Sequence, residues 1–191
     1  MGRDGARAEW QDLSIDDLRG LTLIVGASDT GKSTFAHWLT AHLSERGRDV
    51  AHIDGDPGQS DLGPPATITL RQTHNEHWRW FVGATTPRGH TLPLVAGARR
   101  LADRARGADA IVYDTTGFVH SRGGGLHLKQ ALVDVLRPRT IVAIQAADEL
   151  KPIVEPLRRR SDLRLRELPS AAGVCTKTRG ERHAFRRHRF Q

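Results

Sequence analysis

The sequence predicts an α/β fold in which helices cover both faces of a mostly parallel sheet. Short apolar runs, such as residues 21–25 and 140–144, alternate with longer segments of helical periodicity along most of the chain. Strands that are buried on both faces have this continuous apolar character. Glycine-rich loops follow several of these runs, as expected at the edge of a parallel sheet where ligands bind.

The chain opens with a strand, a glycine-rich loop and a helix. Residues 21–25 form the strand, and residues 32–46 carry apolar side chains at helical spacing until Gly47 ends the helix. Residues 50–54 form a second buried strand. The stretch 55–65 is rich in Gly, Pro and Asp and is therefore predicted to be a loop.

The alternation continues beyond this loop. Residues 78–83 and 110–114 are predicted strands, with a helix over 92–106 between them. A glycine-rich connection at 121–125 precedes a helix over 130–136.

Two more strands are predicted near the end of the chain, over residues 140–145 and 163–168. The helical segment between them, 149–160, contains Pro152 and Pro156. Because proline removes a backbone donor, we expect this segment to be interrupted.

Size and composition indicate one domain spanning residues 1–191. The longest apolar runs fall far short of the roughly 20 residues that cross a bilayer, so we expect no contact with a membrane. The first residues lack the apolar segment of a secretory signal. The only cysteine, Cys175, cannot form an internal disulfide, which agrees with a reducing compartment. A cytoplasmic protein is expected.

The chain is strongly basic, with a formal net charge of +7. This charge favours an anionic partner such as nucleic acid. Arginine supplies 25 of the 29 basic residues, which suits phosphate recognition. A GC-rich or thermophilic genome explains the same bias equally well, so the charge alone does not identify the partner.

Residues 26–33, Gly-Ala-Ser-Asp-Thr-Gly-Lys-Ser, fit the phosphate-loop pattern G-x-x-x-x-G-K-[ST] and stand between a predicted strand and helix. They predict a P-loop NTPase-like fold that binds ATP and Mg²⁺. Lys32 is expected to reach the β and γ phosphates, and Ser33 to ligate Mg²⁺. The expected nucleotide-binding residues are Gly26, Ala27, Ser28, Asp29, Thr30, Gly31, Lys32, Ser33 and Thr34.

Polar residues follow the second strand in the order Asp54-Gly-Asp56-Pro-Gly-Gln59. They are placed at the same edge of the sheet as the phosphate loop, where an acceptor would bind. One carboxylate there could accept the proton of an attacking hydroxyl while its neighbour orients Mg²⁺. The alternative is an ordinary acidic turn.

The strand over 110–114 ends in Asp114, which is followed by Thr115, Thr116, Gly117 and Phe118. P-loop proteins place a second Mg²⁺-linked carboxylate at such a strand end. The two threonine hydroxyls could bind phosphate oxygens. Phe118 could stack on a base, or it could simply pack in the core.

The end of the chain, about residues 174–191, is rich in Arg and His. Arg182 and Arg186 fall on one face of a predicted helix. This helix could close over the triphosphate as a lid and supply arginines to the transition state. A solvated basic terminus is the alternative.

Taken in order, these motifs resemble those of the polynucleotide 5′-hydroxyl kinases related to the RNA kinases of eukaryotic pre-mRNA cleavage, tRNA splicing and ribosomal RNA processing. Residues 26–34 are similar to the family's G-x-x-D-x-G-K-[ST]-[ST], and residues 54–59 to its D-x-D-x-G-Q. Residues 81–87 resemble a β-rich segment that ends in Pro, and residues 114–118 resemble D-T-[ST]-G-W. The similarity covers roughly residues 10–189.

The resemblance implies roles for individual residues. Asp56 would act at the acceptor hydroxyl, with Asp54 as the competing candidate. Phe118, which stands where the family has Trp, would clasp the terminal base. The family's basic lid positions correspond to Lys177, Arg182 and Arg186. The extra terminal domains of the eukaryotic members have no counterpart in this sequence, which resembles a minimal kinase module.

The expected activity is therefore Mg²⁺-dependent transfer of the γ-phosphoryl group of ATP to the 5′-hydroxyl end of RNA or DNA. One alternative is a P-loop kinase or NTPase acting on a small molecule, which would have no need of Phe118 or the basic tail. Another is an ATP-binding scaffold without transfer activity, although Lys32, Ser33 and Asp56 are all present. RNA versus DNA preference, end structure, nucleotide selectivity and oligomeric state stay open.

Overall fold

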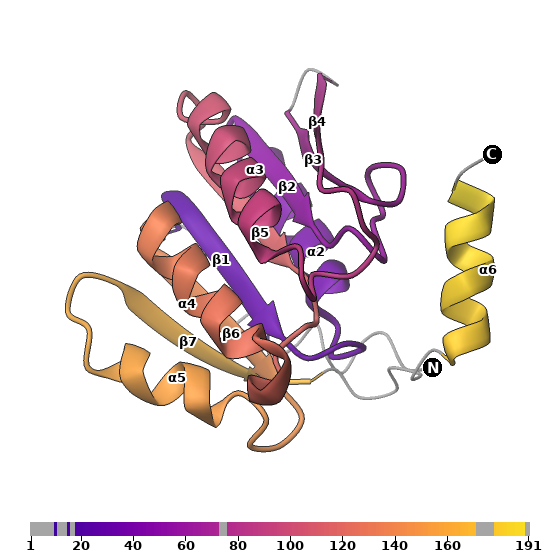
Figure 1. Ribbon diagram of the computed structural model, residues 1–191. Helices are drawn as coiled ribbons and strands as arrows, with labels where there is room; N and C mark the ends of the chain where they lie inside the picture. The colour runs from indigo at the N-terminus through magenta and orange to yellow at the C-terminus, as the bar shows by residue number, and fades with distance from the viewer. Residues whose placement is uncertain (1–9, 11–14, 16–17, 73–75, 171–177, 190–191) are drawn as a thin grey trace, which may run out of the picture.

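A computed structural model describes residues 10, 15, 18–72, 76–170 and 178–189. Within these ranges, seven strands form one sheet in the order β4-β3-β2-β5-β1-β6-β7 (Figure 1). The strands are β1 (Gly20–Gly26), β2 (Val50–Gly55), β3 (Thr67–Arg71), β4 (His77–Phe81), β5 (Ala110–Thr115), β6 (Thr140–Gln145) and β7 (Arg164–Pro169). The helices are α2 (Lys32–Glu45), α3 (Thr91–Arg104), η2 (Ser121–Gly123, one 3₁₀ turn), α4 (Gly125–Leu136), α5 (Lys151–Arg158) and α6 (Arg179–Arg189).

The predicted α/β class with a mostly parallel sheet is confirmed. Strands β2, β5, β1, β6 and β7 run parallel, and only β3 is antiparallel to its neighbours β2 and β4. The central strand β1 lies between β5 and β6, so the strand order reverses beside it. In open α/β sheets ligands bind at the carboxyl ends of the strands near such a reversal.

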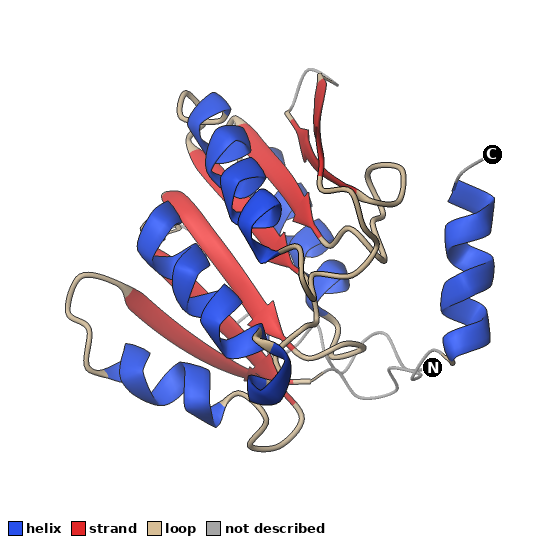
Figure 2. Ribbon diagram, viewed as in Figure 1, coloured by secondary structure: helices blue, strands red, loops and turns tan. Residues whose placement is uncertain are grey.

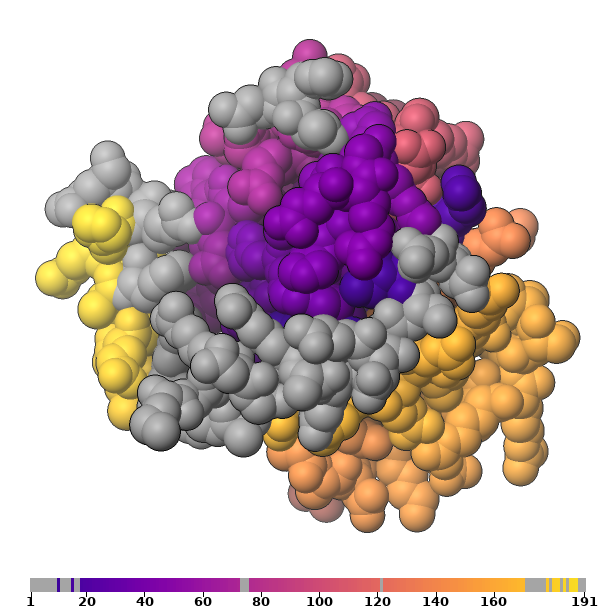
Figure 3. Space-filling view, turned by 180° about the vertical axis from the view of Figure 1, so that it is seen from behind, coloured from indigo at the N-terminus to yellow at the C-terminus, as the bar shows by residue number. Residues whose placement is uncertain are grey.

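The helices form a layer on each face of the sheet (Figure 2). Helices α3, α4 and α5 pack on one face and contribute Leu94, Leu132 and Ile153 to the larger buried cluster. Helix α2 covers the other face through Phe35 and Leu39. Figure 3 shows that second face from behind, with residues of the 30–60 region at its centre in violet and the α5 and β7 segment in orange below.

Aromatic side chains complete the packing on the face of α2. Trp10 is 3% exposed and meets the ring of Phe35 edge on, with centroids 5.3 Å apart. Its ring also lies 5.4 Å from that of Trp38. Trp10 therefore covers the apolar side chains of α2 with its ring.

Three local predictions need correction. Strand β3 was not predicted, and its residues Thr67–Arg71 pair antiparallel with both β2 and β4. Helix α4 begins at Gly125, five residues before the predicted start. Helix α5 continues through both prolines: Pro152 stands in the first turn, where backbone N–H groups have no helical partner, and Pro156 is accommodated inside the helix.

A close contact between neighbouring strands fixes the end of β2. A side chain added at Gly55 would place its Cβ 2.3 Å from Cε1 of Tyr113 on β5. The Tyr113 ring is completely buried. Only glycine therefore fits at the residue that separates Asp54 from Asp56.

Helix α6 stands beside the body of the molecule, on the side toward which β1 points (Figure 1). Its start is capped by a reciprocal pair of hydrogen bonds: Thr178 N donates to Glu181 Oε2, and Glu181 N donates to Thr178 Oγ1. The predicted basic helix therefore exists, whereas its closure as a lid stays a prediction. No helix in the described ranges is long and apolar enough to cross a membrane.

Candidate nucleotide and acceptor site

The phosphate loop connects β1 to α2 at the carboxyl edge of the sheet. Two of its residues adopt left-handed backbone angles, Asp29 with φ of 59° and Gly31 with φ of 91°. Thr30 Oγ1 donates a hydrogen bond to the carbonyl of Ala27 across the loop, at 3.0 Å. Such a turn directs backbone N–H groups inward at a helix N-terminus, which is the arrangement that binds phosphate.

Lys32 is the buried cation of this loop. Its side chain is 6% exposed, and Nζ donates to the carbonyl of Ala27. Burial lowers the pKa of Lys32, while the carboxylates of Asp114, Asp56 and Asp29 raise it. The predicted nucleotide-binding lysine thus lies within reach of acidic groups from three segments of the chain.

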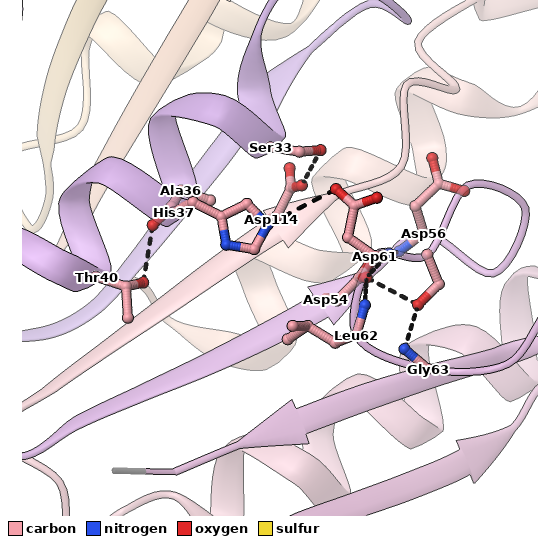
Figure 4. Close-up of polar contacts among 11 residues, drawn as sticks. Ser33, Ala36, His37, Thr40, Asp54, Asp56, Asp61, Leu62, Gly63 and Asp114 are labelled. Atoms are coloured by element: carbon pink, nitrogen blue, oxygen red, sulfur yellow. Dashed lines mark hydrogen bonds and ion pairs between the residues drawn. The ribbon is translucent and has the colours of Figure 1, made fainter. Parts of the chain in front are cut away.

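Ser33 and Asp114 meet at the base of the site. Ser33 Oγ donates to Asp114 Oδ2 at 2.6 Å (Figure 4). The other carboxylate oxygen, Oδ1, is buried and has no hydrogen-bond partner among the described residues. Burial raises the pKa of Asp114 to about 6, although Lys32 and the Ser33 hydroxyl oppose the shift.

This pair fits Mg²⁺. The ion prefers oxygen ligands and usually combines one or two carboxylates with substrate phosphates. A hydroxyl, an unpartnered carboxylate oxygen and an adjacent phosphate loop supply that donor set. Across the described ranges, no group of three or more His, Cys, Asp or Glu side chains could hold a metal ion by itself.

Asp54 has a different environment from the one expected of a metal ligand. It is 4% exposed and faces Asp114 in register across β2 and β5. Its carboxylate accepts four hydrogen bonds from the loop that follows, as Figure 4 shows in part: from Asp56 N, Ser60 Oγ, Asp61 N and Leu62 N. Burial, together with the nearby charge of Asp114, raises the pKa of Asp54 to about 7. Asp54 therefore anchors the loop that carries Asp56.

Asp56 projects from that loop and is partly exposed. Its Oδ1 accepts hydrogen bonds from the backbone N–H groups of Gly58, at 2.8 Å, and Gln59, at 3.1 Å. The carboxylate is thus oriented by a tight turn while its charge acts on Lys32 and Asp114. The Gln59 amide donates to the carbonyl of Gly58, so its predicted contact with substrate stays a prediction.

The threonines at the carboxyl end of β5 are engaged inside the protein. Thr115 is 1% exposed and donates from Oγ1 to the carbonyl of Ile24 at 2.7 Å. Thr116 is also buried, at 4% exposure. Direct contact of the Thr115 hydroxyl with phosphate does not agree with this geometry, because that hydroxyl already bridges two strands.

Sequence reasoning missed Lys129. It lies on α4, is completely buried, and donates from Nζ to Thr115 Oγ1 at 2.8 Å and to the carbonyl of Thr116. Burial, together with the charge of Lys32, lowers its pKa to about 7. The available signal was a single lysine among the leucines of a buried helix, since a lysine on such a face needs partners.

Phe118 is neither fully buried in the core nor fully exposed for base stacking. It is partly buried and packs against the larger hydrophobic cluster, yet its loop touches the phosphate loop. A side chain at Gly117 would place its Cβ 2.4 Å from Ser28 Oγ. The segment that carries Phe118 therefore adjoins the nucleotide site directly.

The basic tail reaches the phosphate loop through Arg182. Its guanidinium forms an ion pair with Asp29, and the two side chains are 25% and 13% exposed. Arg186 is partly exposed one turn further along α6. Lys177, the third expected basic position, lies outside the described residues. The ion pair brings one predicted lid arginine to the loop.

Comparison with known proteins shows the family of this chain. The family model for the "mRNA cleavage and polyadenylation factor CLP1 P-loop" matches residues 26–191. A polyribonucleotide 5′-hydroxyl-kinase of Pyrococcus abyssi is 32% identical over 94% of this chain and 53% of its own length. The corresponding protein of Pyrococcus horikoshii is 34% identical over 88% of this chain and 48% of its own length. The chain thus spans about half the length of the curated relatives it matches.

A solved structure shows the same fold. The wild-type Clp1p–Pcf11p complex matches 91% of this chain and 49% of the solved chain, with a TM-score of 0.72 and 14% sequence identity. The family model covers most of the chain, including the phosphate loop, both acidic segments and the basic tail. The chain therefore belongs to the CLP1 P-loop family.

Proposed function

We propose that this chain is an ATP-dependent polynucleotide kinase that transfers the γ-phosphoryl group to a 5′-hydroxyl end of RNA or DNA. The observation that carries the proposal is the position of Asp56. A turn beyond the end of β2 holds its carboxylate, and its charge acts on Lys32 of the phosphate loop. The names of the archaeal relatives, polyribonucleotide 5′-hydroxyl-kinases, support the same activity.

In this proposal residues 26–34 hold the triphosphate. Backbone N–H groups of the loop bind the phosphate oxygens, and Lys32 leaves the Ala27 carbonyl to follow the γ-phosphoryl group. Ser33 and Asp114 hold Mg²⁺, which supplies electrostatic stabilisation of the phosphate charge when it is bound. Asp54 supports this arrangement by fixing the acidic loop rather than by contacting the ion directly.

Asp56 acts as the base. The acceptor 5′-oxygen forms a bond to the γ-phosphorus, the bond between that phosphorus and the β–γ bridging oxygen breaks, and Asp56 receives the hydroxyl proton. Because one carboxylate oxygen is fixed by Gly58 and Gln59, the other can be presented to the hydroxyl with little loss of side-chain freedom.

The remaining predicted residues have supporting roles in this proposal. Phe118 supplies a ring for the terminal base, and Gln59 lies beside the acceptor loop. Thr115 and Thr116, held by Lys129, keep the Phe118 segment in place. Arg182 and Arg186 meet the charge that develops on the transferring phosphoryl group as α6 closes.

The test uses γ-labelled ATP and a single-stranded oligonucleotide with a 5′-hydroxyl. The matched control is the same oligonucleotide with a 5′-phosphate, and Lys32→Ala is the inactive variant. The proposal expects label on the hydroxyl oligonucleotide only, and no label with Lys32→Ala. Hydrolysis of ATP without oligonucleotide labelling would favour an NTPase or a small-molecule kinase. Nucleotide binding without either reaction would favour a scaffold.

A further inference from the structure

We infer that Arg88 binds the 3′-phosphate of the terminal nucleotide and so makes the acceptor site select a polynucleotide over a free nucleoside. This inference rests on the proposed kinase function and adds a residue to its substrate site. It comes from a contact between two segments that lie 30 positions apart in the sequence.

Arg88 and Phe118 lie side by side above Gly123. A Cβ added at Gly123 would lie 2.9 Å from Cζ of Phe118 and 3.2 Å from Nη2 of Arg88. Both side chains therefore border the same point in space, and η2 passes beneath them. An aromatic ring and a guanidinium are thus placed together at the edge of the proposed base-binding site.

The Arg88 guanidinium is available for a ligand. The side chain is exposed, and its backbone N–H donates to Thr86 Oγ1 at 3.3 Å. In the described part of the chain, the guanidinium takes part in no hydrogen bond or ion pair. A planar cation in this position can make two parallel hydrogen bonds to phosphate oxygens.

Three loops beside the proposed acceptor position touch one another. The loop with Phe118 contacts the phosphate loop at Ser28. The loop with Arg88 contacts the Asp56 turn, because a Cβ at Gly58 would lie 2.4 Å from the carbonyl oxygen of Thr85. The loops that carry Asp56, Phe118 and Arg88 are therefore linked to one another by direct contacts.

A terminal nucleotide presents three groups that match these residues. Its 5′-hydroxyl, its base and its 3′-phosphate leave the same ribose in different directions. With the hydroxyl at Asp56 and the base on Phe118, a cation next to Phe118 meets the 3′-phosphate. A free nucleoside lacks that phosphate, whereas every 5′ end of a polynucleotide carries it.

The experiment compares minimal acceptors. Phosphoryl transfer from saturating ATP is measured with cytidine, cytidine 3′-monophosphate and cytidine 2′-monophosphate, and kcat/KM is determined for each. The proteins are the wild type, Arg88→Ala and Arg88→Lys. Arg166→Ala is the matched control, because Arg166 is an exposed arginine on β7 at the opposite edge of the sheet.

We expect the wild type to prefer the 3′-monophosphate over cytidine by about 10- to 100-fold, the usual effect of a charge-assisted hydrogen bond. Arg88→Ala should reduce this ratio to near one, and Arg88→Lys should keep part of it because the charge stays while the planar fork is lost. The 2′-monophosphate should gain less than the 3′-monophosphate. Arg166→Ala should keep the wild-type ratio.

A second readout uses binding of a single-stranded oligonucleotide at several salt concentrations. One lost phosphate contact should lower the slope of log K against log salt by about 0.7 in Arg88→Ala and leave it unchanged in Arg166→Ala. An active wild type with an unchanged 3′-phosphate preference in Arg88→Ala would overturn this inference and leave the kinase proposal intact. A wild type that labels no oligonucleotide would overturn both.

Discussion

Two aspartates separated by one residue have different surroundings. Asp54 lies inside β2 beside Asp114, and its carboxylate holds the following loop through four hydrogen bonds. Asp56 lies beyond the strand, and only its Oδ1 is held, by two backbone N–H groups. The two carboxylates therefore have distinct surroundings, and in the proposed function only Asp56 acts at the acceptor.

For Asp56→Asn we expect single-turnover transfer to fall by about 10²- to 10⁴-fold, since that is the usual contribution of a general base. Nucleotide affinity, measured separately, should be retained because the phosphate loop is unchanged. In Asp54→Asn we expect a loss of about 1–3 kcal/mol of unfolding free energy, because an amide group would face backbone donors. Normal stability with no transfer in Asp54→Asn, together with near wild-type transfer in Asp56→Asn, would exchange the two roles.

Lys129 shows why part of the site could not be predicted. The segment from Asp114 to Phe118 was predicted at a strand end, but the partner of Thr115 and Thr116 comes from α4. A single lysine within a helix is ordinarily on the surface. Only the packing of α4 against the sheet places this one inside.

Lys129→Met provides a test through pH. Burial lowers the pKa of Lys129 from 10.5 to about 7 in the folded protein. Above pH 7 the unfolded chain therefore binds one more proton than the folded chain, and this group makes stability rise with pH up to about 10.5. Below pH 7 Lys129 is protonated in both the folded and the unfolded chain, so it no longer makes stability depend on pH.

The stability difference between wild type and Lys129→Met should therefore grow in favour of the wild type by about 1.4 kcal/mol per pH unit above pH 7. Urea unfolding of both proteins between about pH 7 and 9 measures this slope, because other titrating groups cancel in the difference. A constant difference across that range would mean that Lys129 keeps its proton when buried.

Among the secondary-structure elements, the parallel strands were predictable and β3 was not. Strands such as β1 and β6 are continuous apolar runs, because both of their faces are covered. Thr67–Arg71 instead alternates threonine with apolar residues, which is a strand pattern, but the run is only five residues long and follows a loop, so its signal is short. The antiparallel hairpin of β3 and β4 depends on pairing with β2, which is a tertiary contact.

Helix α6 offers a prediction at the scale of an element. Arg182 pairs with Asp29 in the phosphate loop, whereas Arg187 on the same helix is exposed. If α6 acts as a lid, Arg182→Ala should lower kcat by on the order of 10²-fold and change KM little, because the arginine meets charge in the transition state. Arg187→Ala is the matched control. Equal effects of both variants, confined to salt-dependent binding, would indicate a general basic surface.

At the scale of the whole molecule, two buried clusters support one sheet, and Trp10 contributes to the smaller one. Truncating a buried aromatic side chain commonly costs about 3–5 kcal/mol, so Trp10→Ala should lower the unfolding free energy by that amount. Guanidinium or urea unfolding monitored by circular dichroism checks this. A change within experimental error would show that the first segment adds nothing to the stability of the domain.

The order of the motifs along the chain was enough to place them all at one edge of the sheet, because parallel strands end there together. It was not enough to predict which loops touch. The contact of Arg88 with the Phe118 segment, and the ion pair of Arg182 with Asp29, join residues 30 and 153 positions apart in the sequence. Such contacts depend on loop conformations that a linear pattern does not encode.

The close approach of Gly55 and Tyr113 has a consequence for how related sequences diverge. The residue between the two aspartates can become larger only if the ring at position 113 becomes smaller, because both would occupy the same space. Among homologues, the two positions should therefore change together, with alanine or serine at the first accompanying a smaller side chain at the second. In this protein, Gly55→Ala should be strongly destabilising alone and partly rescued by Tyr113→Val, a coupling that a double-mutant cycle measures directly.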